Sequence, residues 1–139
     1  MVILGIETSC DDTAAAIISG ETTVCSNIIS SQTAFHEKYG GIVPEIASRK
    51  HQENILPVIT EALHAARLAL ADVDGIAVTQ GPGLVVSLLV GINIAKAIAY
   101  ARGLPLAGIN HLEGHLLAPH VEHAIPCPHI ALVVSGGHT

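Results

Sequence analysis

Residues 2–18 of the chain are VILGIETSCDDTAAAII, the stretch that decides the fold. It begins with a short apolar run, Val2 to Ile6, that is rich in β-branched residues, and it ends with a second apolar run, Ala14 to Ile18. A short polar connection joins the two runs, so the pattern predicts a β-hairpin. The hydroxyls, backbone N–H groups and two carboxylates of this connection are typical either of a ligand-binding turn or of an ordinary solvated hairpin turn.

Downstream of the hairpin, apolar strands alternate with helices. Pro57 interrupts a long helical pattern, so we expect two helices there rather than one. The expected elements are strands at 2–6, 14–18 and 22–30, helices at 44–53 and 56–70, a strand at 76–79, a helix at 84–102, a strand at 106–109, a helix from 111 to about 123, and a strand at 129–134. With the helices around Pro57 taken as one unit, the order is β-β-β-α-β-α-β-α-β. This order predicts an α/β fold, a mixed sheet with helices on its faces.

The segment 84–102 is the most apolar part of the chain. It is apolar almost all round, so we expect a helix that is covered on several sides. Ser87, Asn93 and Lys96 interrupt it, which favours a buried helix over a membrane span. Gly91 within the segment indicates close packing of the helix backbone against a neighbour.

Composition limits the classes of function. The 139 residues suffice for one domain or for half of a two-lobed protein. The net charge of −6, with six Lys plus Arg, makes the surface alone a poor binder of phosphate backbones. Three cysteines without a CxxC pattern indicate neither a disulfide framework nor a zinc knuckle. Glu7 interrupts the first apolar run, so we expect no signal peptide and a cytoplasmic location.

Two histidines, His111 and His115, directly follow the predicted buried strand 105–110. On a helix they lie about 40° apart and one turn apart, so they can share one metal ion. Open α/β sheets place their sites at such strand ends. Zinc proteases of the helical type have Glu directly after the first histidine, where this chain has Leu112. Glu113 lies about 200° around the axis from His111 and points away from the metal face.

Two ligands leave a metal site open. The third ligand would be His138, an acidic residue of the first turn, or a residue beyond this chain. Ser135-Gly136-Gly137 follows the last predicted strand and fits a phosphate cradle or a plain turn. Gly81-Pro82-Gly83 predicts a rigid lead-in to the apolar helix. Because the last strand runs into a Gly-Gly turn, we expect residues 1–128 to form a first lobe and residues 129–139 to begin a second.

Five motifs occur in one order: GIETSCDDT at 5–13, YGGIVPEIASR at 39–49, GPGL at 81–84, HLEGHLLAP at 111–119 and SGGHT at 135–139. Together they closely resemble the N-terminal lobe of the TsaD family, also called Gcp, in its bacterial branch. The resemblance implies the actin-like ATPase fold (ASKHA, ribonuclease H-like), with two related lobes around a cleft. It also implies transfer of a threonylcarbamoyl group from threonylcarbamoyl-AMP to N6 of the adenine 3′ of the anticodon, in tRNAs that read codons beginning with A.

The resemblance assigns roles to individual residues. It implies that His111 and His115 bind one divalent metal ion, iron or zinc, with an Asp of the second lobe as third ligand. Ser9, Asp11 and Asp12 become the candidate catalytic residues of the cleft, and Asp12 stands where the family often has Glu. The residues that would contact the acyl-adenylate or an adenine nucleotide are Val133, Val134, Ser135, Gly136, Gly137 and His138.

Partners follow from the same resemblance. The family pairs through its N-terminal lobe with a smaller TsaB-type paralogue and needs a TsaE-type P-loop ATPase, with tRNA bound through the complex and no membrane involved. The helices between 44 and 70 and the exposed side of the 84–102 helix are the candidate pairing surfaces. Two alternative functions are a metal-dependent endopeptidase, which Glu113 argues against, and a non-catalytic pairing paralogue, which should have lost the histidine pair. Without a second lobe we expect weak nucleotide binding, an incomplete metal site and no transferase activity.

Overall fold

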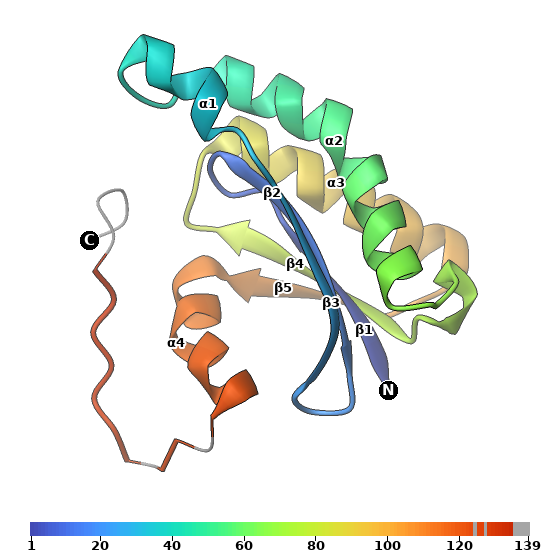
Figure 1. The fold of residues 1–139 in the computed structure, drawn as a ribbon. Coiled ribbons are helices and arrows are strands. Elements are labelled where there is room, and N and C mark those ends of the chain that lie inside the picture. Colours follow the sequence, from blue (N-terminus) through green and yellow to red (C-terminus); the bar gives the residue numbers. More distant parts are fainter. Residues whose placement is uncertain (124, 127, 135–139) are drawn as a thin grey trace.

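A five-stranded mixed sheet forms the centre of the molecule (Figure 1). The computed structural model describes residues 1–123, 125–126 and 128–134. The strand order is β3-β2-β1-β4-β5. Neighbours among the first three strands are antiparallel, and β1, β4 and β5 are parallel, so the predicted hairpin and mixed sheet are confirmed. The strands are β1 (Val2–Glu7), β2 (Asp12–Ser19), β3 (Thr23–Ser31), β4 (Gly75–Gly81) and β5 (Leu106–Asn110).

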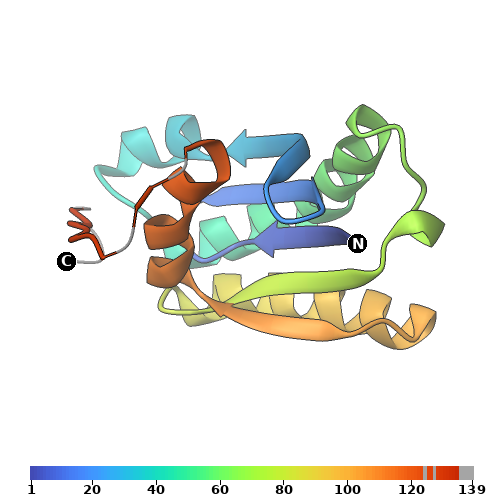
Figure 2. The same cartoon turned by 90° about the horizontal axis from the view of Figure 1, so that it is seen from below.

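Helices lie on both sides of this sheet. The long helices α2 and α3 cover one face, while α4 lies on the other side, at one end of the strands (Figures 1 and 2). Two short pieces, α1 and η1, connect β3 to α2 where the sequence predicts a loop. The bounds are α1 (Thr33–His36), η1 (Glu37–Tyr39), α2 (Pro44–Ala65), η2 (Leu70–Asp72), α3 (Val85–Arg102) and α4 (His111–Glu122).

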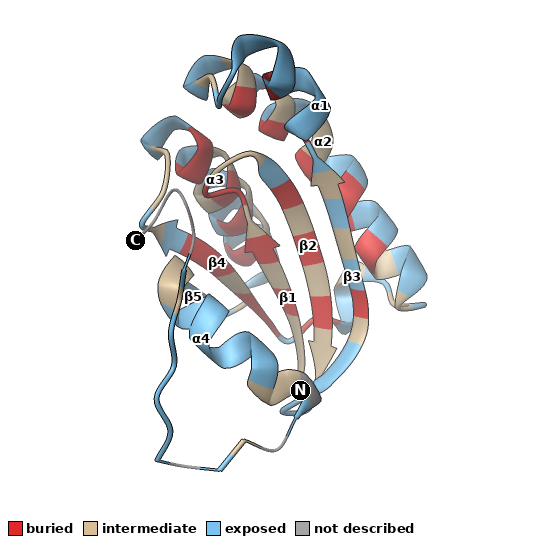
Figure 3. Cartoon of the chain, turned by 60° about the vertical axis from the view of Figure 1, so that its left-hand side comes forward, coloured by how far each residue is buried: buried red, intermediate tan, exposed pale blue. Residues whose placement is uncertain are grey.

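The hydrophobic core fills the space between the sheet and the pair α2 and α3. Alternate residues of the central strands point into it, as the period of two in a strand requires, and they form the red bands of Figure 3. Burial of each Val, Leu or Ile side chain stabilises the fold by about 1.5–3 kcal/mol, and that of each alanine methyl group by less. The core side chains are Leu4, Ile6, Ala15, Ile17, Ile55, Val58, Ile59, Ala62, Val73, Ile76, Val78, Ala95 and Ala99.

Helix α2 runs through Pro57 without a break, so the prediction of two helices is wrong. A proline inside a helix costs about 3 kcal/mol, because it removes one hydrogen bond and crowds the preceding turn. Here Ile55 precedes the proline, Val58 and Ile59 follow it, and all three are buried in the same core. Packing on both sides of Pro57 outweighs the local penalty. The helix ends at Ala65 rather than Leu70.

Helix α3 is covered on one side only, which corrects the expected cover on several sides. Its outer residues Val85, Leu89 and Tyr100 are 70%, 49% and 92% exposed. Within the described part of the chain, α3 is the one helix whose length and hydropathy would suffice to cross a membrane, with 28% of it buried. Its inner side packs on β4 and α2, so the apolar outer side is a surface feature of this fold.

The close packing predicted at Gly91 is confirmed. A Cβ added there would lie 2.5 Å from Thr8 Oγ1. The Thr8 hydroxyl is buried at that point, where it donates to Ser87 O at 2.9 Å and accepts from Gly91 N at 3.2 Å. This contact ties the first turn to α3.

Gly91→Ala is expected to destabilise the protein by about 1–3 kcal/mol, because overpacking against Thr8 exceeds the gain in helix propensity. Gly114→Ala in α4 is the matched control, since its Cβ would meet nothing within 4 Å, and it should stabilise by up to about 1 kcal/mol. Urea unfolding of both variants measures the difference. Stabilisation by Gly91→Ala would contradict the packing.

Two predictions near the end of the chain need correction, the burial of one strand and the existence of another. The segment 105–110 forms β5 as expected, but all five residues of β5 are exposed because it is the edge strand of the sheet. Residues 129–134 form no strand, which corrects the final β of the predicted order. A strand needs a neighbour for its backbone hydrogen bonds, and this segment pairs with none of the described strands.

Candidate functional site

The carboxyl ends of three parallel strands meet at one edge of the sheet. Strand β1 ends at Glu7, β4 at Gly81 and β5 at Asn110. Ile6 pairs with Val78, and Thr79 pairs with Ile109. The residues that follow these pairs in the three strands therefore lie side by side at this edge. Ligand sites of open α/β sheets form at this edge. The structure therefore joins residues that lie about 70 to 100 positions apart in sequence.

Helix α4 places the histidine pair at this edge. The Asn110 side chain caps the helix by accepting from Leu112 N and Glu113 N, so the helix starts at His111. The Nε2 atoms of His111 and His115 lie 3.2 Å apart. Two imidazole nitrogens that bind one tetrahedral zinc at about 2.1 Å are roughly 3.4 Å apart, so the pair fits a shared metal ion. Among the described residues, no group of three or more His, Cys, Asp or Glu side chains is placed to hold a metal.

Glu7 holds the ring of His111 from the side away from His115. Its carboxylate accepts from Thr79 Oγ1 at 2.6 Å, from Ser9 N, and from His111 Nδ1 at 3.1 Å. A carboxylate only accepts, so Nδ1 carries a hydrogen, and in the neutral ring Nε2 is then the nitrogen with the free lone pair. Burial alone would raise the pKa of Glu7, but the hydrogen bonds from Ser9, Thr79 and His111 together outweigh it and hold the pKa below its usual value.

Sequence patterns missed Glu7 and Thr79 as site residues. The one signal in the sequence is that Glu7 is a charged residue at the end of an apolar strand. Its side chain points to the face of the sheet opposite to that of Ile6, away from the core. Its partners come from β4 and α4, which no local pattern connects to β1. The geometry gives Glu7 a role in orienting the ring of His111.

The first turn contributes Ser9 to the histidine pair, while its two aspartates lie apart. Ser9 is 2% exposed, and its Oγ lies 3.1 Å from His111 Nδ1. Asp11 is half-buried and lines a separate hollow of about 310 Å³ with His36. Asp12 is exposed. Neither aspartate joins the described histidine pair as a third ligand.

The predicted nucleotide segment is only partly described. Val133 is half-buried and Val134 is 74% exposed, and both lie in the extended tail after α4. Ser135, Gly136, Gly137 and His138 lie outside the described residues, so their predicted contacts stay predictions.

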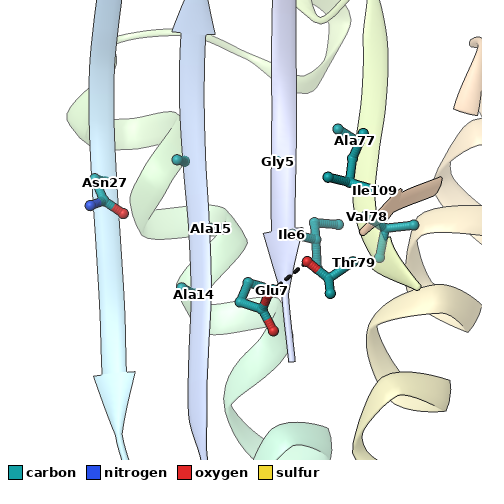
Figure 4. A pocket seen from close by; sticks show the side chains of 11 residues that line it. Gly5, Ile6, Glu7, Ala14, Ala15, Asn27, Ala77, Val78, Thr79 and Ile109 are labelled. Carbon is teal, nitrogen blue, oxygen red and sulfur yellow. Dashed lines mark hydrogen bonds between the residues drawn. The ribbon is translucent and has the colours of Figure 1, made fainter. Parts of the chain in front are cut away.

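An apolar hollow of about 280 Å³ adjoins Glu7 on the sheet face opposite α2 and α3 (Figure 4). It exists because the strands present small residues there, such as Gly5, Ala14 and Ala77. Glu7 and Thr79 lie at its border, joined by their hydrogen bond. The site thus combines an ionised carboxylate and a histidine pair with an apolar floor.

Cys10 lies in the first turn, and its thiol is ionised less readily than an ordinary cysteine thiol. Burial, reinforced by the neighbouring carboxylates Asp11 and Asp12, raises the pKa of its thiol to about 11. At pH 8 such a thiol is about 100-fold less ionised than one with the ordinary pKa of 9.0, and only the thiolate is nucleophilic. The raised pKa argues against Cys10 as a nucleophile at neutral pH.

Alkylation of Cys10 by iodoacetamide at pH 8 is expected to be about 100-fold slower in the folded chain than in the chain unfolded by urea. Because the pKa is raised, the folded-state rate should increase about tenfold for each pH unit up to about 11. Peptide mapping by mass spectrometry follows the two rates. Equal rates in the folded and unfolded chains would contradict the raised pKa.

Comparison with known proteins decides the family. The family model described as TsaD, tRNA N6-adenosine threonylcarbamoyltransferase, matches residues 23–139. The chain belongs to this family. Relatives with the same description share with it 60% identity in Syntrophus aciditrophicus, 59% in Moorella thermoacetica and 56% in Treponema pallidum (strain Nichols), over 99–100% of the chain. This TsaD-family chain spans 39–41% of the length of these relatives.

Solved structures confirm the predicted fold class. YeaZ from Pseudomonas aeruginosa superposes with a TM-score of 0.61 at 21% identity, covering 79% of this chain and 45% of that protein. The Thermus thermophilus RuvC structure in complex with a Holliday junction substrate gives a TM-score of 0.51 at 15% identity, over 86% of this chain and 73% of that protein. The TsaD-family chain therefore has a ribonuclease H-like fold.

Proposed function

We propose that the full-length protein transfers a threonylcarbamoyl group from threonylcarbamoyl-AMP to N6 of the adenine 3′ of the anticodon, in tRNAs that read codons beginning with A. In this step N6 bonds to the carbamoyl carbon, the bond from that carbon to the AMP phosphate oxygen breaks, and N6 loses one proton. The observation that carries the proposal is the pair His111 and His115 beside Ser9, in a chain of the TsaD family.

The histidine pair would hold a divalent metal ion, iron or zinc, through the two Nε2 atoms. Such an ion holds substrate oxygen and polarises a carbonyl group. The chain itself fixes the ligands, since Glu7 and Ser9 fix the ring of His111 and the Asn110 cap fixes the start of α4. With two described ligands, we expect a third from the remainder of the full-length protein, an Asp of the second lobe by resemblance to the family.

The first turn and the glycine-rich end of the chain would bind the acyl-adenylate. We propose that Ser9, Asp11 and Asp12 line the cleft between the lobes, with an aspartate as candidate acceptor of the N6 proton. Residues 133–138, including Gly136 and Gly137, would contact the adenylate through backbone N–H groups. We assign residues 1–128 to the first lobe and 129–139 to the start of the second.

A metal-dependent endopeptidase is the alternative. That chemistry needs a general base beside the metal, and helical zinc proteases take it from the residue after the first histidine. Here that residue is Leu112, and Glu113 is exposed. The geometry favours group transfer over peptide hydrolysis.

We propose that a TsaB-type paralogue docks on the outer side of α2 and α3. A hollow of about 410 Å³ between these helices is lined by Ser48, Gln52, Val86, Leu89, Val90, Asn93 and Ile94. Exposed apolar side chains around it are typical of a protein–protein surface. A TsaE-type P-loop ATPase would complete the assembly. With a net charge of −6 the chain alone is a poor tRNA binder, so we expect partners or the second lobe to hold the tRNA, in the cytoplasm.

Transfer of radiolabelled threonine to tRNA tests the function. The full-length protein with its two partners is expected to label tRNA, whereas residues 1–139 alone, shown to be folded by circular dichroism, should label none. A Glu113→Gln variant of the full-length protein should keep full transfer. Full activity of the 139-residue chain, or peptide hydrolysis that Glu113→Gln abolishes, would contradict the proposal.

A further inference from the structure

Four buried polar side chains lie behind the first turn and are not explained by the metal site. Thr13, Gln32 and His51 are 0% exposed and His36 is 4% exposed. Thr13 lies in β2 and Gln32 at the junction of β3 and α1. His36 lies in α1 and His51 in α2. Buried polar groups are tolerated where they are hydrogen-bonded, and every one of these is.

The partners of His51 fix its tautomer. Its Nε2 lies 3.1 Å from the carbonyl oxygen of Cys10, which only accepts, so Nε2 carries the hydrogen. Burial lowers the pKa of His51 against the raising effect of Glu7, Asp11 and Asp12, so the ring is neutral. The other nitrogen, Nδ1, then accepts from Thr13 Oγ1 at 2.8 Å and faces Gln32 Nε2 at 3.4 Å.

The partners of His36 fix its tautomer in the same way. Val43 N donates to His36 Nδ1 at 3.4 Å, so the hydrogen is on Nε2, which donates to Gln32 Oε1 at 3.2 Å. The amide of Gln32 is thereby oriented, with its nitrogen toward Ala47 O and His51 Nδ1. A directional chain of hydrogen bonds runs from Val43 N through His36, Gln32 and His51 to the carbonyl of Cys10.

Three consecutive carbonyls of the first turn are anchored to three different segments. Ser9 O accepts from Leu84 N at 2.7 Å, Cys10 O accepts from His51, and Asp11 O accepts from Gln32 N at 3.1 Å. The second anchor is the end of the hydrogen-bond chain, whereas the first and third are backbone N–H groups. The turn between β1 and β2 is thus held from the interior, while its side chains border the site.

We infer that His36, Gln32 and His51 are positioning residues that hold the Ser9–Asp12 turn in the geometry that threonylcarbamoyl transfer requires. This inference rests on the proposed function. Without these side-chain hydrogen bonds, the carbonyl of Cys10 loses its fixed donor, and the middle of the turn, next to Ser9, is held only by the backbone bonds on either side of it. The residues act through the turn and touch no reacting atom.

Three variants of the full-length protein with its partners test this role. His51→Leu removes both hydrogen-bonding atoms, whereas His51→Gln supplies an amide that can donate to Cys10 O and accept from Thr13. Gln32→Glu keeps the shape of the side chain and removes its two N–H donors. Ile55→Ala, one turn further along α2, is the matched control because it weakens the core while the apolar side chain of Ile55 donates no hydrogen bond to the turn.

His51→Leu and Gln32→Glu are expected to lower kcat for transfer by about 10- to 100-fold, as lost supporting contacts do at active sites, and to speed amide hydrogen exchange at residues 10–13 by at least about tenfold. His51→Gln should stay within about threefold of the wild type for both, and Ile55→Ala should lower only the melting temperature. If His51→Leu does not fold, Gln32→Glu decides.

Wild-type kcat and wild-type exchange at residues 10–13 in Gln32→Glu would overturn the positioning role. So would a loss of kcat in Ile55→Ala equal to that in His51→Leu. Failure of the wild-type protein to transfer threonylcarbamoyl would instead overturn the proposed function. The exchange measurement decides the positioning role in that case, because it needs no activity.

Discussion

His111→Ala is expected to remove the bound metal from the full-length protein and to lower threonylcarbamoyl transfer by at least about 100-fold. The two Nε2 atoms lie 3.2 Å apart, close enough to share one ion. Loss of one ligand from an open site leaves too few bonds to retain the ion. A metal that polarises a carbonyl contributes several kcal/mol to the transition state, and each 1.4 kcal/mol is a factor of about ten in rate.

Metal content by mass spectrometry and single-turnover transfer to tRNA measure the two effects. His115→Ala should behave in the same way, since its ring lies 4.6 Å from that of His111, centroid to centroid. His64→Ala is the control, because His64 is an exposed histidine in the last turn of α2 and should change neither quantity. Wild-type metal content in His111→Ala would exclude this pair as the metal site.

Local patterns predict the histidine pair because its geometry is local. Two residues four apart on a helix share a face whatever the rest of the protein does. Asn110 is a preferred N-cap, so the start of α4 directly after β5 also follows from neighbouring residues. The hairpin of β1 and β2 is predicted for the same reason, since a short polar connection allows little else.

Non-local packing decides what the patterns miss. Glu7 meets Thr79 because β1 pairs in parallel with β4, a contact across 72 positions. Pro57 stays inside α2 because the core holds the helix on both sides of it. The outer side of α3 is open because the sheet and α2 cover only its inner side, which an apolar composition does not reveal.

Removal of the negative charge at Glu7 should lower the metal affinity of the site almost as much as removal of one of the two histidines. Glu7→Gln is expected to lower metal affinity by about 10- to 100-fold, the usual effect of changing the group that orients a metal-binding histidine. The carboxylate accepts three hydrogen bonds, from Ser9 N, Thr79 Oγ1 and His111 Nδ1. An amide has one accepting oxygen, and its NH2 group would face a donor.

The ring of His111 is then free to turn, and the negative charge that favours a bound cation is lost. Competition with a chelator measures metal affinity without any need for transfer activity. Thr79→Val is the graded control, because it removes one of the three hydrogen bonds but keeps the carboxylate, and its affinity should fall only a few-fold. If Glu7→Gln binds the metal as tightly as the wild type while His111→Ala does not, the histidines are ligands that need no support from β1, and the strand end serves folding alone.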